Sequence, residues 1–118
     1  MSRAGNKIVV LMTCDKEEEA RRIADRLLRE RKAACVSIYP RGNSFYWWKG
    51  EIESAEEHLL IAKTREGLLE DLISLVKETH SYEIPEIISV PVAGGSEDYL
   101  NWLDGVLGKF SAEGKDHI

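Results

Sequence analysis

The sequence contains no glutamine and has only three asparagines, three prolines and two cysteines. Two cysteines are too few for a disulfide framework, so Cys14 and Cys35 are predicted to be free thiols. The scarcity of amide side chains, beside abundant Glu, Lys and Arg, favours a heat-adapted source.

The sequence also lacks a long apolar segment. No stretch approaches the roughly 20 apolar residues that a membrane-spanning helix needs. Residues 1–6 are too short and too polar for a secretory signal. These absences predict a cytoplasmic protein that has no membrane partner.

An excess of positive charge is missing as well. The net charge of -5 argues against a nucleic-acid partner, because that binding depends on clustered Lys and Arg. The arginines of the first predicted helix lie among acidic residues, which predicts a solvated, ion-paired face. The residues of this face are Arg21, Arg22, Arg26, Arg29, Glu17, Glu18, Glu19 and Asp25.

Hydrophobic periodicity predicts one α+β domain over residues 1–118, with an ordered core over about 7–107 and a flexible tail at 108–118. The predicted elements are a strand at 8–12, a helix at 16–32, a strand at 34–39 that resumes at 45–48, a return strand from 51 to 62, a helix at 68–79, a strand at 87–90 and a helix at 97–107. Asp15 is predicted to cap the first helix and Ser96 the third. The order is that of ferredoxin-like split βαβ domains, in which the third strand lies beside the first and two helices cover one face.

The second and third strands form a long hairpin with aromatic residues on both faces. Phe45 and Trp47 point to one side of the strand, while Tyr46 and Trp48 point to the other. Since two helices cover only one face, a neighbouring copy of the chain is expected to cover these rings. The alternative is that they pack within their own subunit, against the third helix. Composition does not choose among dimer, trimer and tetramer.

Five segments are distinctive: AACV at 33–36, SFYWWKG at 44–50, KT at 63–64, HSYEIPEII at 80–88 and YLNWL at 99–103. In this order they resemble the CutA family of divalent-cation tolerance proteins, and the similarity runs from residue 8 to residue 107. The resemblance implies a ferredoxin-like fold, a homotrimer held by strand pairing between subunits, and a function in tolerance of divalent cations, copper above all. Where the family usually has proline, this chain has Ser81.

The resemblance also implies a copper site. Its ligands in the family are a Cys near the end of the first strand and the His and Glu that match His80 and Glu86. In this chain that Cys position aligns with Met12, and Cys14 follows two residues later on the same side of the strand. The predicted metal ligands are therefore His80, Glu86 and Cys14.

The segment from His80 to Glu86 also suggests metal binding by itself, because an imidazole and carboxylates suit Cu(II) or another divalent cation. The alternative is that His80 caps the second helix while Glu83 and Glu86 are solvated. No cofactor is expected to be obligatory.

A second predicted site is a cleft between subunits. Lys63, Tyr82 and Trp48, with Glu83 beside them, combine a cation, a phenol and an indole that would hold a small anion. The alternative is that Lys63 neutralises a carboxylate and the rings only pack. The sequence has no phosphate-binding glycine loop, nucleophile elbow, dinucleotide fingerprint or HExxH helix, so no enzyme is predicted. A metal-binding trimer is thus the leading hypothesis, and a signalling or scaffold trimer with an anionic ligand is the alternative.

Overall fold

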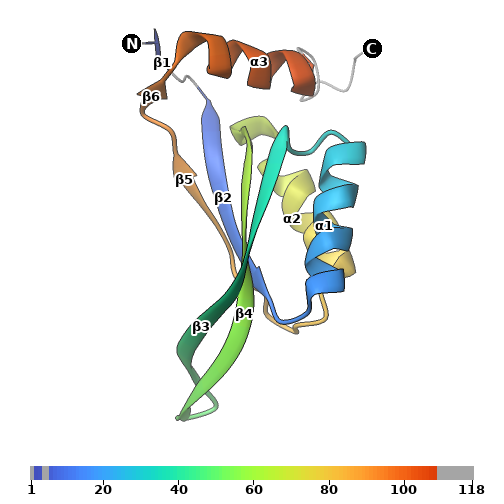
Figure 1. Ribbon diagram of the computed structural model, residues 1–118, viewed down its shortest axis with the longest axis vertical. Helices are drawn as coiled ribbons and strands as arrows, with labels where there is room; N and C mark the ends of the chain where they lie inside the picture. The colour runs from blue at the N-terminus through green and yellow to red at the C-terminus, as the bar shows by residue number, and fades with distance from the viewer. Residues whose placement is uncertain (1, 4–5, 109–118) are drawn as a thin grey trace.

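The computed structural model describes residues 2–3 and 6–108 and shows a mixed α+β fold (Figure 1). Its main antiparallel sheet has the strand order β3-β4-β2-β5. The strands are β2 (Lys7–Cys14), β3 (Cys35–Trp48), β4 (Glu51–Arg65) and β5 (Ile87–Pro91). The third predicted strand, β4, therefore lies beside the first, β2, which confirms the predicted order. The predicted tail lies outside the described residues, apart from Gly108.

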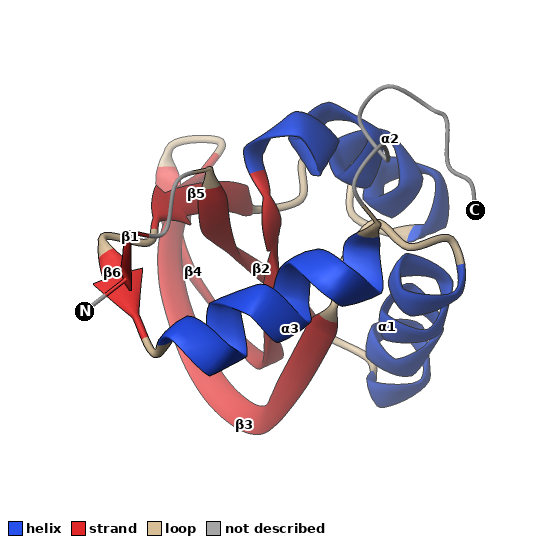
Figure 2. Ribbon diagram, turned by 90° about the horizontal axis from the view of Figure 1, so that it is seen from above, coloured by secondary structure: helices blue, strands red, loops and turns tan. Residues whose placement is uncertain are grey.

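Two helices, α1 (Glu17–Arg29) and α2 (Leu69–Thr79), cover one face of this sheet, and the short 3-10 turn η1 (Glu66–Leu68) precedes α2 (Figure 2). In β2 every second residue is buried, because the strand's pleat turns alternate side chains toward the helices. These buried residues are Ile8, Val10, Met12 and Cys14. They pack with apolar residues of both helices, among them Ile23, Leu27, Leu72 and Val76.

The third helix, α3 (Glu97–Leu107), lies across one end of the sheet (Figure 1). Ser96 caps it as predicted, since its hydroxyl accepts a hydrogen bond from the Tyr99 amide at 3.4 Å. Asp104 ties the helix to the sheet through Lys7 Nζ at 2.7 Å and Arg65 Nη1 at 3.1 Å. A minor sheet, not predicted, pairs β1 (Ser2–Arg3) with β6 (Gly94–Gly95).

The first helix and the second strand differ from their predictions. The first helix begins at Glu17, and Lys16 occupies the N-cap position without a side-chain hydrogen bond, so Asp15 is not the cap. The helix ends at Arg29, shortly before Arg31 takes up a positive φ of 58°. β3 runs through the predicted interruption, where the chain absorbs Pro40 as an irregularity in register between Tyr39 and Gly42.

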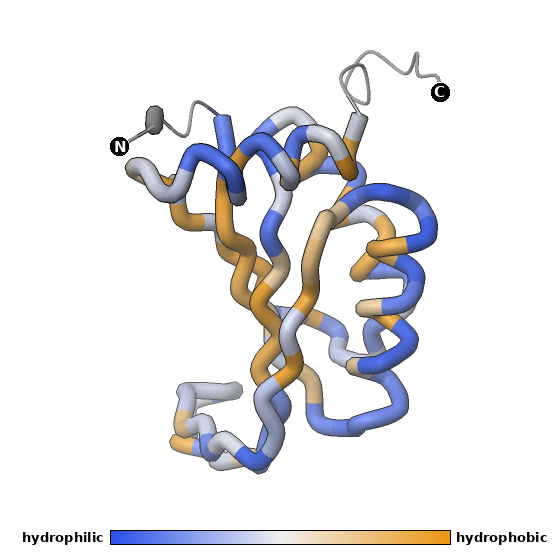
Figure 3. The backbone as a smooth tube through the Cα atoms, turned by 45° about the horizontal axis from the view of Figure 1, so that its top comes forward, coloured by the Kyte–Doolittle hydropathy of each residue, from blue (hydrophilic) through white to orange (hydrophobic). Residues whose placement is uncertain are grey.

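The face of the sheet opposite α1 and α2 is apolar and uncovered within the described chain. Leu11 of β2 lies between its partners Ile61 on β4 and Ile88 on β5, and Val9 lies beside Val90. Residues paired in this way point to the same face of a sheet. Ile88 is 53% exposed. In Figure 3 the apolar colour is concentrated in the middle of the sheet, whereas much of the hairpin is pale or blue.

The β3–β4 hairpin extends beyond the helices, at the end of the molecule opposite α3 (Figure 1). Phe45 and Trp47 are 73% and 72% exposed. The interpretation that these rings pack against the third helix is therefore wrong, because the hairpin and α3 lie at opposite ends of the sheet. None of the helices in the described part of the chain is long and apolar enough to cross a membrane.

Candidate functional site

His80 lies where three elements meet: the end of β2, the start of α1 and the end of α2. It follows α2 as the C-cap residue, and its amide donates to the Val76 carbonyl at 2.8 Å. The predicted capping role is thus filled by the backbone of His80. Its side chain, which is fully buried, instead reaches the Thr13 carbonyl through Nε2 at 2.6 Å and Glu19 Oε2 through Nδ1 at 3.2 Å.

Glu19 is the residue of this cluster that the sequence-based prediction misplaced. The sequence predicts it on the solvated face of the first helix, but it is buried, and it accepts a hydrogen bond from the Ser81 amide at 3.1 Å. The helical period explains the error, since position 19 lies on the same stripe as Ile23 and Leu27. That spacing was the signal that would have identified it. The predicted ion pairing on the outer face of α1 is confirmed in part, since Arg21 pairs with Glu17 and Arg29 with Asp25.

The hydrogen bonds of His80 assign its ring nitrogens. A carbonyl oxygen only accepts, so Nε2 must carry a proton to donate to Thr13. Nδ1 faces two groups: the Tyr82 amide, which donates to it at 3.0 Å, and the Glu19 carboxylate. In the neutral ring the Nδ1 lone pair is therefore directed into the cluster. Such a division, with one nitrogen anchored by a carbonyl, is common in metal-binding histidines.

Cys14 completes the cluster. It is fully buried, and its thiol lies 3.7 Å from the Lys16 carbonyl. Burial, and next the negative charge of Glu19, raise the pKa of the Cys14 thiol from 9.0 to about 11. One potential ligand atom each from Cys14, Glu19 and His80 lie within 4.8 Å of one another.

These three donors fit a transition-metal ion in kind, because Zn(II) and Cu(II) both accept sulfur, imidazole nitrogen and carboxylate oxygen. Bond lengths of about 2.0 to 2.3 Å set ligand atoms roughly 3.3 to 3.8 Å apart in a tetrahedron. The Glu19–His80 contact of 3.2 Å is already close to this range. Small side-chain movements would bring Cys14 within it.

Tyr82 connects this cluster to a larger cavity. Its ring lies 4.7 Å from the His80 ring, and its hydroxyl donates to Glu57 Oε2 at 2.6 Å. Burial, and next the hydrogen bond to Glu57, raise the pKa of the Tyr82 phenol, so it remains protonated and a donor. Glu57 is itself buried and was not among the predicted site residues. Glu57 can accept from Tyr82 only because the fold places β4 beside residue 82, and no local pattern in the sequence predicts that contact.

A cavity of about 770 Å³ lies between the β3–β4 hairpin, the end of β2 and the segment from Tyr82 to Glu86. It brings together seven of the predicted site residues: Phe45, Tyr46, Trp47, Trp48, Tyr82, Glu83 and Glu86. His80 is not in this lining, and Glu86 is, so the structure puts the two predicted metal ligands on different sides of Tyr82. The thiol and the carboxylate that lie beside His80 are instead those of Cys14 and Glu19.

Lys63 is also outside the cavity lining. It lies on β4, where its Nζ is 3.9 Å from Cys35 Sγ, opposite Val9. Within one chain the structure therefore does not bring Lys63 to Tyr82 and Trp48. The cleft between subunits to which it was assigned stays a prediction.

Comparison with known proteins gives the family. Residues 8–106 match the profile described as "CutA1 divalent ion tolerance protein". The "Divalent-cation tolerance protein CutA" of Thermus thermophilus is 46% identical over 95 residues, which are 80% of this chain and 92% of that protein. Among solved structures, CutA from Xylella fastidiosa has a TM-score of 0.84 at 33% identity and covers 86% of this chain and 98% of its own. The chain belongs to the CutA family of divalent-cation tolerance proteins.

The relatives differ in length and in the location that their names give. A rice relative named "Protein CutA 1, chloroplastic" is 46% identical over 96 residues, 81% of this chain but 54% of that protein. The chain thus spans about half the length of the plant relatives it matches. A structure from Archaeoglobus fulgidus, described as a periplasmic divalent cation tolerance protein, has a TM-score of 0.83 at 40% identity, over 86% of this chain and 98% of its own.

The burial of Cys14 generates a prediction about its reactivity. In a Cys35→Ser variant, where Cys14 is the single thiol, reaction with a disulfide reagent at pH 8 is expected to be at least about a hundredfold slower in the folded than in the unfolded protein. The reason is that the thiolate attacks, and the pKa rises from 9.0 to about 11 on folding. The measurement is the release of the coloured thiol with and without guanidinium. Equal rates would show that Cys14 is exposed.

Proposed function

We propose that this chain contributes to tolerance of divalent cations by binding Cu(II) or another divalent ion through Cys14, Glu19 and His80. The observation that carries the proposal is the approach of these three side chains to within 4.8 Å, all of them buried. Membership of the family supports the general function. Copper, as the ion, is our proposal.

The chemistry of the cluster favours a metal over a simple packing role. A buried carboxylate and a buried imidazole are costly unless they are partnered. Here the partners are backbone groups: the Thr13 carbonyl and the Tyr82 amide for His80, and the Ser81 amide for Glu19. A divalent ion would add a positive charge between the Glu19 carboxylate and the Cys14 thiol, whose ligand atoms already lie within 4.8 Å of each other. It would replace the thiol proton and the hydrogen bond from the Tyr82 amide to Nδ1, while the Thr13 carbonyl would keep the ring oriented.

Copper titration of four variants tests the proposal. Cys14→Ser and Glu19→Gln are expected to bind Cu(II) ~10- to 100-fold more weakly than wild type, because each loses a ligand. Cys35→Ser is the matched thiol control and Glu86→Gln the matched carboxylate control, and both should bind like wild type. Calorimetry gives the affinities, and circular dichroism shows whether each variant is folded. If only Glu86→Gln weakened binding, the site would lie in the cavity and the proposal would be wrong.

We also propose that the chain acts as a homotrimer. Its support is the uncovered apolar face of the sheet around Leu11, Ile61 and Ile88, together with the exposed hairpin rings. A contiguous exposed apolar surface usually marks an interface. The unpaired edges at β3 and β5 provide strands to which another copy can add. The number of subunits, three, is taken from the family resemblance.

Ile88→Glu tests which face is used. At micromolar concentration the wild-type chain is expected to sediment as a trimer, and Ile88→Glu as a smaller species, because a charge would be buried against a neighbouring copy. Leu28→Glu is the control, since Leu28 is 43% exposed on α1 and Ile88 is 53% exposed on the open sheet face. A wild-type chain that is folded and monomeric would contradict the trimer.

The alternative function, a signalling or scaffold module with an anionic ligand near Lys63 and Tyr82, has less support. The cavity that holds Tyr82 is lined by acids, and Lys63 is not in that lining. A neighbouring subunit would have to provide the cation. The cytoplasmic location and the absence of an enzymatic activity remain predictions.

A further inference from the structure

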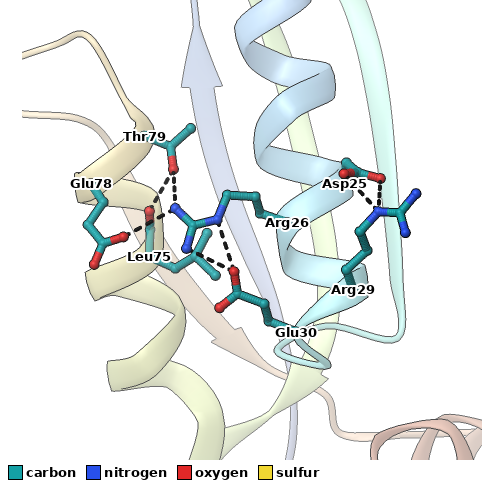
Figure 4. Close-up of polar contacts among 7 residues, drawn as sticks. All are labelled: Asp25, Arg26, Arg29, Glu30, Leu75, Glu78 and Thr79. Atoms are coloured by element: carbon teal, nitrogen blue, oxygen red, sulfur yellow. Dashed lines mark hydrogen bonds and ion pairs between the residues drawn. The ribbon is translucent and has the colours of Figure 1, made fainter.

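One buried side-chain nitrogen in the described part of the chain has no hydrogen-bond partner: Nδ1 of His58 on β4. Other side-chain nitrogens are satisfied even near the surface. Arg26, for example, uses all three nitrogens of its guanidinium group (Figure 4). Its acceptors are Glu30, Glu78 and Thr79. A buried polar atom without a partner costs free energy, so the bare nitrogen of His58 calls for an explanation, such as an ion that binds there.

The register of the sheet places His58 beside the metal cluster. His58 and Cys14 are direct partners across the β2–β4 ladder. Their side chains point to the face that α1 and α2 cover, because the next pair on that face, Met12 with Leu60, is fully buried there. Opposite residues of an antiparallel pair have Cβ atoms about 4.5 to 5.5 Å apart. The imidazole of His58 therefore starts from the position on β4 directly beside the Cys14 thiol.

The cluster itself is one ligand short of a closed site. Cys14, Glu19 and His80 offer three donor atoms, whereas a tetrahedral ion takes four. In closed sites protein side chains provide all four ligands, and thiolate and imidazole occur together among them. Imidazole nitrogen also suits Cu(II). A second imidazole beside Cys14 would complete the set.

The His58 ring has to move to reach a bound ion, since it lies outside the group whose ligand atoms are within 4.8 Å of one another. The structure leaves room for this movement. His58 lines a second cavity, of about 300 Å³, between the first turns of α1 and residues 36–40 of β3. This cavity lies on the helix-covered face, away from the rings of the hairpin. A strand added at the edge of β3 would extend the sheet in its own plane and leave the layer between β3 and α1 in place.

We propose that His58 is the fourth ligand of this metal site, an inference that rests on the function proposed above. When the ion binds, the ring turns toward Cys14 and coordinates through Nδ1, the nitrogen that has no other partner. Without the ion, Nδ1 stays buried and unsatisfied. The site thus keeps a local cost in stability that metal binding removes.

His58→Phe tests the proposal, because it keeps an aromatic ring and removes both nitrogens. Without metal, the variant is expected to melt at or above the wild-type temperature, since an unsatisfied buried nitrogen is lost. With Cu(II), calorimetry should show at least about a tenfold loss of affinity. Pulsed electron paramagnetic resonance should count two coordinated imidazoles in wild type and one in the variant. A lower melting temperature with unchanged copper affinity would assign His58 a structural role and overturn the proposal.

His117→Phe is the matched histidine control. His117 lies outside the described residues, and its substitution is expected to change neither the copper affinity nor the imidazole count. If the second imidazole is lost in His117→Phe instead of His58→Phe, the proposal is wrong. Circular dichroism verifies folding, and His58→Gln, for which one imidazole is also expected, takes the place of a His58→Phe protein that does not fold.

The same titrations separate this inference from the proposed function. If Cys14→Ser weakens copper binding and folded His58→Phe does not, the site of three residues stands and the fourth ligand is wrong. If neither variant weakens binding, the ion is held elsewhere and both proposals are wrong.

Discussion

The hydrogen bond from His80 Nε2 to the Thr13 carbonyl is the interaction on which the rest of the site depends. It fixes the ring at the end of β2, and so directs Nδ1 toward Glu19 at the start of α1. Because His80 also ends α2, this one side chain joins all three elements. The segment that follows is held in turn, since Glu19 binds the Ser81 amide and Nδ1 the Tyr82 amide. Tyr82 then reaches Glu57 and forms a wall of the cavity.

The buried cluster behind Tyr82 differs from the charged outer face of α1. In the cluster a thiol, a carboxylate and an imidazole are buried at short range, an arrangement suited to a small ion that accepts mixed ligands. On the outer face of α1 several acids and bases pair with each other in solvent, as Arg21 does with Glu17 and Arg29 with Asp25.

Much of the fold could be predicted from the sequence, because it depends on local periodicity. The alternation in β2, the stripes of the helices and the Ser96 cap all follow from neighbouring residues. The site was predicted less completely. The sequence groups Tyr82, Glu83 and Trp48 as the structure does, but Glu57 joins them only through the register of β4, and Lys63 lies outside the cavity lining. Glu19 was misplaced because its charge was given more weight than its place on the apolar stripe of α1. The pairing of subunits is not a property of one chain.

The protonation of the His80 ring tests the central interaction most directly. Long-range proton–nitrogen NMR spectra of uniformly nitrogen-15-labelled protein at neutral pH report each ring nitrogen of the imidazole. The account predicts a proton on Nε2, held by Thr13, and an Nδ1 that accepts from the Tyr82 amide. A neutral ring with its proton on Nδ1 and a bare Nε2 would contradict it, since the carbonyl would then face a lone pair.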